Sequence, residues 1–236
     1  MRCKQMNVQT IADIIENNQT IYQMLKHCPY EILRHWHLSE YPSGTIIFHQ
    51  GDVQESFYII VDGSVDINIM AENGKKYSQA TYHSGYMIGE LEIFDQKPFV
   101  CNVEALTNVK LIELKREIFF QWLKLDQNFH QYITRSLSSQ FYRLSRKAGD
   151  DNLYSLYHRV CRYLIDYLEQ GVKKRQGTEI NVNKHMLSQQ FAVTHRSINR
   201  ILQVLKEKEI IEINSHTLII RNSTRLKEEE QLSRLD

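Results

Sequence analysis

The sequence lacks the features that mark secreted, metal-binding and membrane proteins. Its four cysteines, Cys3, Cys28, Cys101 and Cys161, lie far apart and form no CxxC pair, which fits neither a zinc site nor a disulfide framework. The first eighteen residues carry charges and amides where a signal peptide needs an apolar run. Nowhere are there about 18 consecutive apolar residues, the length of a membrane span. We therefore expect a cytoplasmic protein with free thiols and no membrane contact.

An excess of charge of one sign is also missing. The chain of 236 residues has 29 Lys and Arg against 28 Asp and Glu, a net charge of +1. The whole-chain charge therefore gives no argument for a nucleic-acid partner, and any such argument must come from a local segment. An apolar share of 42% and a charged share of 24% are ordinary for a folded protein of one large or two modest domains.

Residues 46–114 have the pattern of β-strands. β-Branched and aromatic residues, partly alternating with polar ones, fill segments such as SFYIIVDGSVDINIM and NVEALTNVKLIEL. Glycines recur at positions 44, 51, 63, 74, 85 and 89. This spacing predicts a jelly-roll-like β-domain, which a helical segment around residues 11–38 precedes.

Beyond the β-domain the apolar residues follow a helical period. A stripe at steps of four and three residues comprises Phe129, Ile133, Leu137, Phe141, Leu144 and Ala148, and it predicts a long helix. Two partners for the stripe are open: a second copy of the helix in a homodimer, or the β-domain of the same chain. Gly149, Asp150 and Asp151 predict a break, with one aspartate capping a next helix from Leu153 to about Gln170.

Residues 182–205 have the spacing of a helix-turn-helix. A short helix begins near Asn183, residues 192–194 form a turn, and a second helix follows. The inner face of the second helix is apolar, at Ile198, Ile201, Leu202 and Leu205. Its outer face carries donors and acceptors that match guanine and adenine edges, on Arg196, Asn199, Arg200 and Gln203. This outer face is the predicted base-reading surface.

Contacts to DNA phosphates are predicted around the two helix N-termini. Free N–H groups and polar side chains gather there, and the predicted residues are Asn183, Lys184, Thr194, His195 and Ser197. The run IIEINSHTLII predicts a hairpin wing that includes His216 and touches the DNA backbone. Residues 151–222 hold eleven Lys or Arg against seven Asp or Glu. A merely solvated helix face is the simpler interpretation, but the wing and this local charge favour DNA.

This order of parts resembles the Crp-Fnr family, that of the cyclic-AMP receptor protein and FNR. The segments GTIIFHQGD, FYIIVDGSVDI and IGELEIFD are similar to the family's β-roll motifs, and THRSINRIL is similar to its recognition helix. The resemblance implies an α+β fold with an effector-sensing, cyclic-nucleotide-binding-like β-roll at residues 1–114. A dimerisation helix and hinge at 115–150 and a winged helix-turn-helix at 151–236 would follow.

The resemblance also implies a function. We expect a homodimeric transcription regulator, not an enzyme, that binds double-stranded operator DNA, with RNA polymerase as a further partner. The dimer interface would be formed by the stripe residues Phe129, Ile133, Leu137, Phe141 and Leu144. No cofactor is predicted, because an FNR-like iron–sulfur cluster needs clustered N-terminal cysteines. An effector between β-roll and long helix would act through the helix register or the bend near Gly149.

The predicted effector pocket departs from the family pattern. In the family a Gly-Glu-Leu turn precedes an Arg-Ser pair that binds the cyclic phosphate. Here Gly89, Glu90 and Leu91 match the turn, but Phe99 and Val100 stand where the Arg and Ser would be. A buried phosphate without a guanidinium is poorly compensated, so we expect that cyclic AMP is not the effector. The predicted pocket residues are Ile88, Gly89, Glu90, Leu91, Phe99, Val100, Leu144 and Ser145.

An apolar effector, a constitutively active form and a vestigial pocket remain as alternatives.

The recognition helix also departs from the family pattern: where the cyclic-AMP receptor has an Arg-Glu pair and a later Arg, this chain has His195, Arg196 and Arg200. Because a guanidinium only donates and a carboxylate only accepts, the preferred operator should differ.

Two rival functions belong to other classes. A metal-dependent cupin enzyme is suggested by His35, His37 and Glu40, which spell HxHxxE, and by a following PxG…H fragment. The Gly-rich lead-in of that motif is missing, so these histidines are expected in surface or packing roles. The other rival is a cyclic-nucleotide-type sensor module that regulates a partner protein without DNA.

Overall fold

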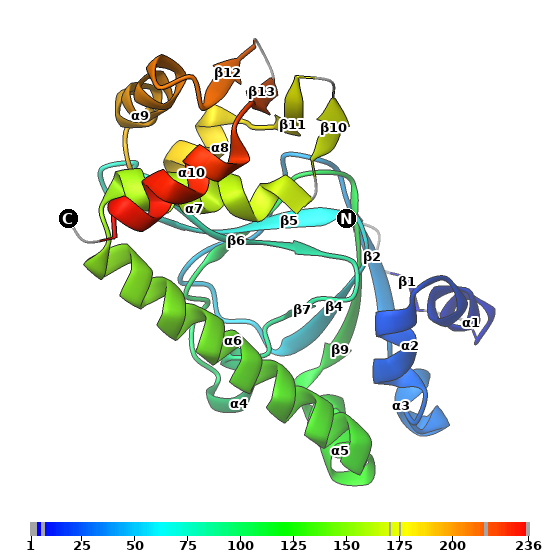
Figure 1. Cartoon of the computed structure of the whole chain (residues 1–236). Coiled ribbons are helices and arrows are strands. Elements are labelled where there is room, and N and C mark those ends of the chain that lie inside the picture. Colours follow the sequence, from blue (N-terminus) through cyan, green and yellow to red (C-terminus); the bar gives the residue numbers. More distant parts are fainter. Residues whose placement is uncertain (1–3, 6–7, 170, 175, 215–216, 235–236) are drawn as a thin grey trace. The chain divides into compact units, whose positions relative to one another are not determined.

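The β-strand pattern of residues 46–114 forms most of two antiparallel sheets in the computed structural model (Figure 1). Residues 4–5, 8–169, 171–174, 176–214 and 217–234 are described. The chain divides into two compact units, residues 1–141 and 142–236. The predicted α+β fold, with a β-roll, a long helix and a helix-turn-helix, is confirmed.

The first unit contains both of these sheets. Their strand orders are β1-β2-β9-β4-β7 and β3-β8-β5-β6. The strands are β1 Lys4–Gln5, β2 His37–Tyr41, β3 Ile46–Phe48, β4 Ser56–Asp62, β5 Ser64–Met70, β6 Lys76–His83, β7 Met87–Ile88, β8 Asn102–Ala105 and β9 Val109–Lys115. Apolar side chains of both sheets, among them Phe48, Ile60 and Leu111, share one buried cluster. At the β4–β5 turn, Gly63 has φ +87°, and a Cβ there would lie 2.2 Å from the carbonyl oxygen of Asn108, so only glycine fits.

Helices flank these sheets in the sequence. They are α1 Val8–Asn17, α2 Gln19–Leu25, α3 Tyr30–Leu33, α4 Glu92–Asp95, α5 Arg116–Leu125 and α6 Gln127–Leu153. The predicted helical segment 11–38 is therefore three short helices, and its last residues belong to β2. The breaks have local causes: Asn18 accepts from the backbone N–H of Ile21 at 3.0 Å and caps α2, and Pro29 precedes α3.

Asp126 separates α5 from α6. One carboxylate oxygen accepts from the Trp122 indole at 3.1 Å, and the other accepts from the backbone N–H groups of Asn128 and Phe129. The Asp126 side chain thus caps the start of α6. Phe129 stacks on Trp122, and both belong to the buried core of the first unit.

The first half of the α6 stripe packs within the first unit. Phe129 and Ile133 are 1% and 2% exposed and belong to its core, and Leu137 packs against that core. The structure therefore removes Phe129 and Ile133 from the predicted dimer face, because these side chains have no surface left to bury. This half of the stripe therefore packs against the first unit of the same chain, which was the other predicted partner.

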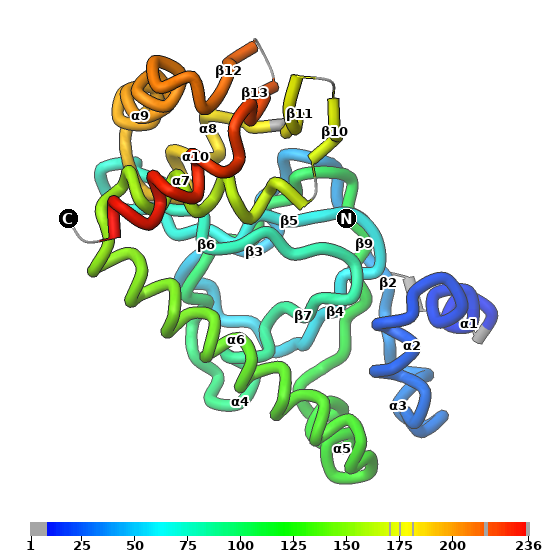
Figure 2. The backbone as a smooth tube through the Cα atoms, viewed as in Figure 1, coloured from blue at the N-terminus to red at the C-terminus, as the bar shows by residue number. Residues whose placement is uncertain are grey.

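The predicted break at residues 149–151 is wrong. Helix α6 continues without interruption through Gly149 to Leu153 (Figure 2). A glycine inside a helix costs only about 1 kcal/mol relative to alanine. Asp151 offsets this cost, since it pairs with Lys147 one turn earlier at 3.8 Å and with Arg159 at 2.6 Å. The break comes instead at Ser155, which caps α7 by accepting from the backbone N–H of His158.

The second unit contains the last turns of α6 and nine further elements among its described residues. They are α7 Leu156–Asp166, η1 Tyr167–Glu169, β10 Val172–Lys174, β11 Gly177–Asn181, α8 Lys184–Gln190, α9 His195–Glu207, β12 Ile211–Ile213, β13 Thr217–Ile220 and α10 Ser223–Leu232, with α6 ending at Leu153. The strands form one sheet in the order β10-β11-β13-β12. The predicted helix to Gln170 stops as α-helix at Asp166, and the β10–β11 hairpin was not predicted.

The C-terminal helix α10 packs on α7. The Tyr157 hydroxyl donates to Glu229 at 2.7 Å, and His158, 1% exposed, contacts the carbonyl oxygen of Glu230 through Nδ1 at 2.9 Å. None of the helices formed by the described residues is long and apolar enough to cross a membrane.

Candidate nucleic-acid interface

Helices α8 and α9 are joined by a tight turn. Asn183 caps α8 by accepting from the backbone N–H groups of His185 and Met186 at 2.9 and 3.2 Å. Ala192 takes φ +52° in the turn, and the N–H of Val193 donates back to the carbonyl oxygen of Ser188 at 2.9 Å. The two helices therefore have a fixed connection, as a helix-turn-helix requires.

The side chain of Thr194 begins α9. Its hydroxyl accepts from the backbone N–H of Ser197 at 3.2 Å. The predicted inner face is buried, at Ile198, Ile201, Leu202 and Leu205, and it belongs to the core of the second unit. This burial holds α9 in one rotational setting, with its opposite side toward solvent.

The four residues predicted to read bases lie together on that exposed side. Arg196, Asn199, Arg200 and Gln203 are all exposed. Gln203 donates to Glu207 one turn later at 3.0 Å. Among the described residues, neither Arg196 nor Arg200 takes part in an ion pair. Both guanidinium groups are available to a ligand outside the chain.

A hollow of about 300 Å³ lies beside this face. Its lining joins Asn183 and Lys184 of the α8 start with His195 of α9 and with Asn214 and Thr217 of the β12–β13 hairpin. The hairpin is the predicted wing: β12 pairs with β13 from Ile211↔Ile220 to Ile213↔Leu218. His216 lies outside the described residues. The structure thus brings three of the predicted phosphate-contacting residues, Asn183, Lys184 and His195, together beside the wing.

One contact on this surface was not predicted. The Nδ1 atom of His185 and the Nε2 atom of His195 are 2.9 Å apart, and the rings stack with centroids 5.0 Å apart. Gln189 contacts the other ring nitrogen of His185 at 3.0 Å. His185 therefore positions His195 at the start of the recognition helix, and Gln189 positions His185. The pair is ten residues apart in sequence, so no helical spacing could indicate it.

The predicted effector region in the first unit carries two buried carboxylates. Gly89 has φ +81°, and a Cβ there would lie 3.0 Å from the carbonyl oxygen of Ser56. Glu90, 4% exposed, accepts from Gln140 Nε2 of α6 at 3.0 Å. Burial raises the pKa of Glu90 to about 7, against the effect of its hydrogen bonds. Burial also raises the pKa of Glu92, so negative charge is already costly at this place.

Six of the eight predicted pocket residues belong to the first unit. Ile88 and Phe99 are buried in the cluster between the sheets, where the Phe99 ring stacks on Phe48 with centroids 5.1 Å apart. Leu91 and Val100 are exposed. Leu144 and Ser145 belong to the second unit.

No cation of the described α4 region is free to replace the missing guanidinium. Arg116 donates to the carbonyl oxygens of Ile93 and Phe94 at 2.7 and 3.0 Å. Lys97 is exposed and paired with Asp95 at 3.1 Å.

The second half of the α6 stripe is exposed. Phe141 is 74% exposed and Leu144 39%, and Ser145 and Ala148 are exposed as well. His35, His37 and Glu40 of the rival metal motif lie at the end of α3 and in β2. Among the described residues, no three His, Cys, Asp or Glu side chains are grouped so that they could hold a metal ion.

Two family profiles match the chain, one in each unit. The "Cyclic nucleotide-binding domain" profile matches residues 38–126, and the "Crp-like helix-turn-helix domain" profile matches residues 158–229. The chain is 25% identical over 191 residues to the cAMP-activated global transcriptional regulator CRP of Salmonella typhimurium, which covers 80% of this chain and 91% of that protein. It is 23% identical over 202 residues to the cAMP-activated global transcriptional regulator Vfr of Pseudomonas aeruginosa, covering 83% and 94%.

Solved structures show the same fold. The c-di-GMP responsive global regulator CLP of Xanthomonas campestris superposes with a TM-score of 0.73 at 23% identity, covering 86% of this chain and 99% of that chain. A mutant of CooA from Carboxydothermus hydrogenoformans superposes with a TM-score of 0.72 at 15% identity, covering 97% and 98%.

Proposed function

We propose that this chain, which belongs to the Crp-Fnr family of DNA-binding transcription regulators, binds a pseudo-palindromic operator as a homodimer. We propose further that its effector is a molecule other than cyclic AMP. The observation that carries the proposal is the exposed side of α9. There Arg196, Asn199 and Arg200 project from a helix whose opposite face is buried. Guanidinium and carboxamide groups in this arrangement match the edges of guanine and adenine in the major groove.

The homodimer is proposed from the exposed part of α6. Phe141 and Leu144 present apolar surface on one side of this helix, one turn apart, and a second copy of the helix would cover it. Two α9 helices related by a twofold axis would then enter successive major grooves about 34 Å apart. RNA polymerase remains a proposed further partner, and the absence of enzyme activity remains a prediction.

The effector is proposed to differ from cyclic AMP because of the α4 region. The buried Phe99 ring stacks on Phe48, at the position where the family has an arginine. Glu90 and Glu92, which precede Phe99 closely in sequence, are also buried. A phosphate brought to these carboxyl groups would add negative charge where burial already makes it costly, without a cation to compensate it. The site therefore favours a neutral or apolar ligand, or no ligand.

The DNA-binding proposal is tested by the double substitution Arg196→Ala and Arg200→Ala. Each lost base contact costs about 1–3 kcal/mol, so a gel shift on selected operator DNA should weaken at least about a hundredfold. The matched control is Arg135→Ala with Arg225→Ala, which removes two exposed arginines from α6 and α10. Its operator affinity should stay close to that of the unmodified chain, and both variants should keep the same oligomeric state.

Unchanged sequence-specific binding by the Arg196 and Arg200 variant would reject the proposed reading face. Such a result would favour the sensor module that acts on a partner protein. Calorimetry with cyclic AMP tests the effector proposal separately, and micromolar binding would reject that part alone.

A further inference from the structure

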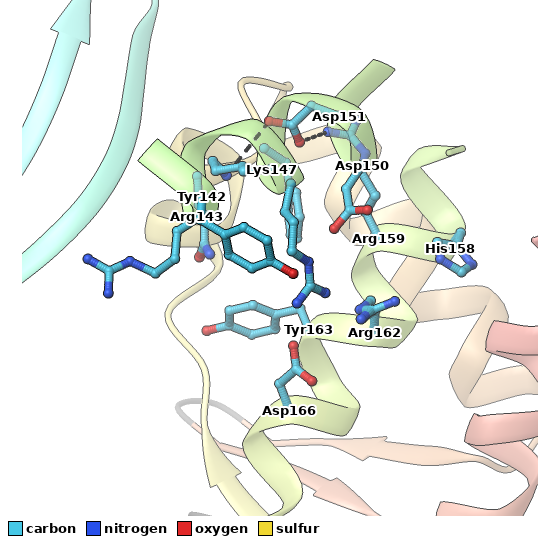
Figure 3. Close-up of a pocket in the computed structure, with 13 residues that line it drawn as sticks. Tyr142, Arg143, Lys147, Asp150, Asp151, His158, Arg159, Arg162, Tyr163 and Asp166 are labelled. Carbon is cyan, nitrogen blue, oxygen red and sulfur yellow. Dashed lines mark hydrogen bonds and ion pairs between the residues drawn. The ribbon is translucent and has the colours of Figure 1, made fainter. Parts of the chain in front are cut away.

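A cavity of about 510 Å³ lies inside the second unit, between the last turns of α6, α7 and the end of α8 (Figure 3). Five Arg or Lys side chains line it against three Asp side chains, so its lining has a formal charge of +2. The residues predicted to read bases take no part in the lining, and the end of α8 contributes only Gln190 and its capping residue Phe191. DNA held on the exposed face of α9 would therefore not enter this cavity.

The two helices that face the cavity carry the same pattern of charges. In α6, Arg143, Arg146 and Asp150 are spaced i, i+3 and i+7, and in α7 Arg159, Arg162 and Asp166 have the same spacing. Residues with this spacing share one face of a helix. Arg146, Arg159 and Arg162 thus bring guanidinium groups from both helices to one concave place, whereas the Arg143 guanidinium points away from it (Figure 3). One guanidinium can bind two phosphate oxygens through parallel N–H···O bonds.

The acidic residues hold part of this cationic set in position without neutralising it. Asp151 pairs with Arg159 at 2.6 Å, and Glu230 lies 3.8 Å from Arg162. Burial raises the pKa of Asp166, and the positive charges of Arg162 and Arg146 oppose that rise. One arginine from each helix therefore acts on the same carboxylate. The buried Nε of Arg159 makes no hydrogen bond within the described part of the chain, and a buried donor without an acceptor costs about 1–3 kcal/mol.

Aromatic rings complete the lining. Tyr142 projects from α6 and Tyr163 from α7 into the space between the helices (Figure 3). The Tyr163 ring packs edge-on against Phe191 with centroids 6.0 Å apart, and the Arg159 guanidinium lies 5.6 Å from the Phe191 ring. Tyr142 is 65% exposed, which leaves room for a flat ligand against its ring.

We propose that this cavity binds a nucleotide, a small molecule that joins phosphate groups to a flat ring. The arginines of α6 and α7 would contact the phosphates, and Tyr142 would stack on the ring. Such a ligand would tie the end of α6 to α7, across the connection at Tyr154 and Ser155. This site is separate from the predicted effector region of the first unit and does not depend on the proposed operator binding.

The test is calorimetry on the full chain with three probes: adenosine triphosphate, inorganic pyrophosphate and adenosine. At about 0.1 M salt, where charged groups still attract each other at close range, the triphosphate should bind with micromolar affinity. Pyrophosphate should bind more weakly than the triphosphate because it lacks the ring. Adenosine should bind at least about tenfold more weakly because it lacks the phosphates.

Two variants locate the binding. Arg146→Gln with Arg162→Gln should weaken triphosphate binding at least about tenfold. The matched control, Arg135→Gln with Arg225→Gln, removes the same charge elsewhere and should change it by no more than about twofold. Asp150→Asn, which removes a negative charge from the lining, should strengthen binding several-fold, and a misfolded variant could not produce that gain.

Two results would overturn the proposal. The first is no heat of binding with either phosphate probe. The second is triphosphate binding that survives Arg146→Gln with Arg162→Gln, which would move the nucleotide to another part of the chain. If that variant also loses affinity equally for random and operator DNA, the cavity is instead a phosphate contact of DNA.

Discussion

Among single residues, Glu90 makes the stability of the folded chain depend on pH. Its carboxyl is buried, and burial raises its pKa to about 7 in the folded chain. The folded state therefore holds this proton over the range from the ordinary pKa of 4.5 to about 7, whereas the unfolded state releases it. Stability due to Glu90 is present below this range and is lost as pH rises through it. The loss amounts to about 3 kcal/mol.

We predict that Glu90→Gln raises the melting temperature, and that it does so more at pH 8 than at pH 5. The amide stays neutral at both values, and its oxygen can still accept the hydrogen bond from Gln140. Thermal melts at the two pH values measure the difference. The control Glu72→Gln changes an exposed carboxylate and should show no such pH dependence. An equal gain at both pH values for Glu90→Gln would mean that Glu90 is ionised throughout.

The sequence could predict the position of some side chains but not the contacts of others. The four exposed α9 residues could be predicted, because a helical period separates them from buried Ile198 and Leu202. The contact between His185 and His195 could not, since it depends on how α8 and α9 cross. The Phe99 ring could be predicted as a departure from the family, but its stacking on Phe48 depends on the closing of the two sheets.

At the scale of elements, α6 shows what a periodic stripe leaves open. The spacing of apolar residues predicted a long helix, and the helix is there. The same spacing could not say which partner covers each part of the stripe, because Phe129 and Phe141 look alike in sequence. Phe129 is buried on Trp122, whereas Phe141 is exposed. Local composition also failed at Gly149, where the helix continues through one glycine and Asp151 forms ion pairs with Lys147 and Arg159.

We predict that Gly149→Ala stabilises the chain by roughly 0.4–1 kcal/mol, because alanine restricts the unfolded chain and favours the helix. A Cβ at this position would meet no heavy atom within 4 Å, so the substitution introduces no clash. Urea unfolding measures the gain, and operator affinity should stay the same. If the variant folds normally but clearly loses operator affinity, DNA binding would require a bend at Gly149 that the structure does not show.

At the scale of the whole molecule, the exposed end of the α6 stripe makes the oligomeric state testable. We predict that the chain sediments as a dimer at micromolar concentration and that Phe141→Glu turns it into a monomer, because a charge would be buried in the interface. The control Tyr30→Glu places the same charge at another exposed aromatic residue and should leave the dimer intact. A monomeric unmodified chain, or a dimer that survives Phe141→Glu, would rule out this interface.

In the proposed homodimer, two α9 helices read one operator in two successive major grooves. Selection of bound fragments from random double-stranded DNA tests it most directly. We expect enrichment of an inverted repeat with half-site centres about one helical turn, roughly 34 Å, apart, and loss of that enrichment with Arg196→Ala and Arg200→Ala. Recovery of no common sequence, or of the same sequence with that variant, would contradict it.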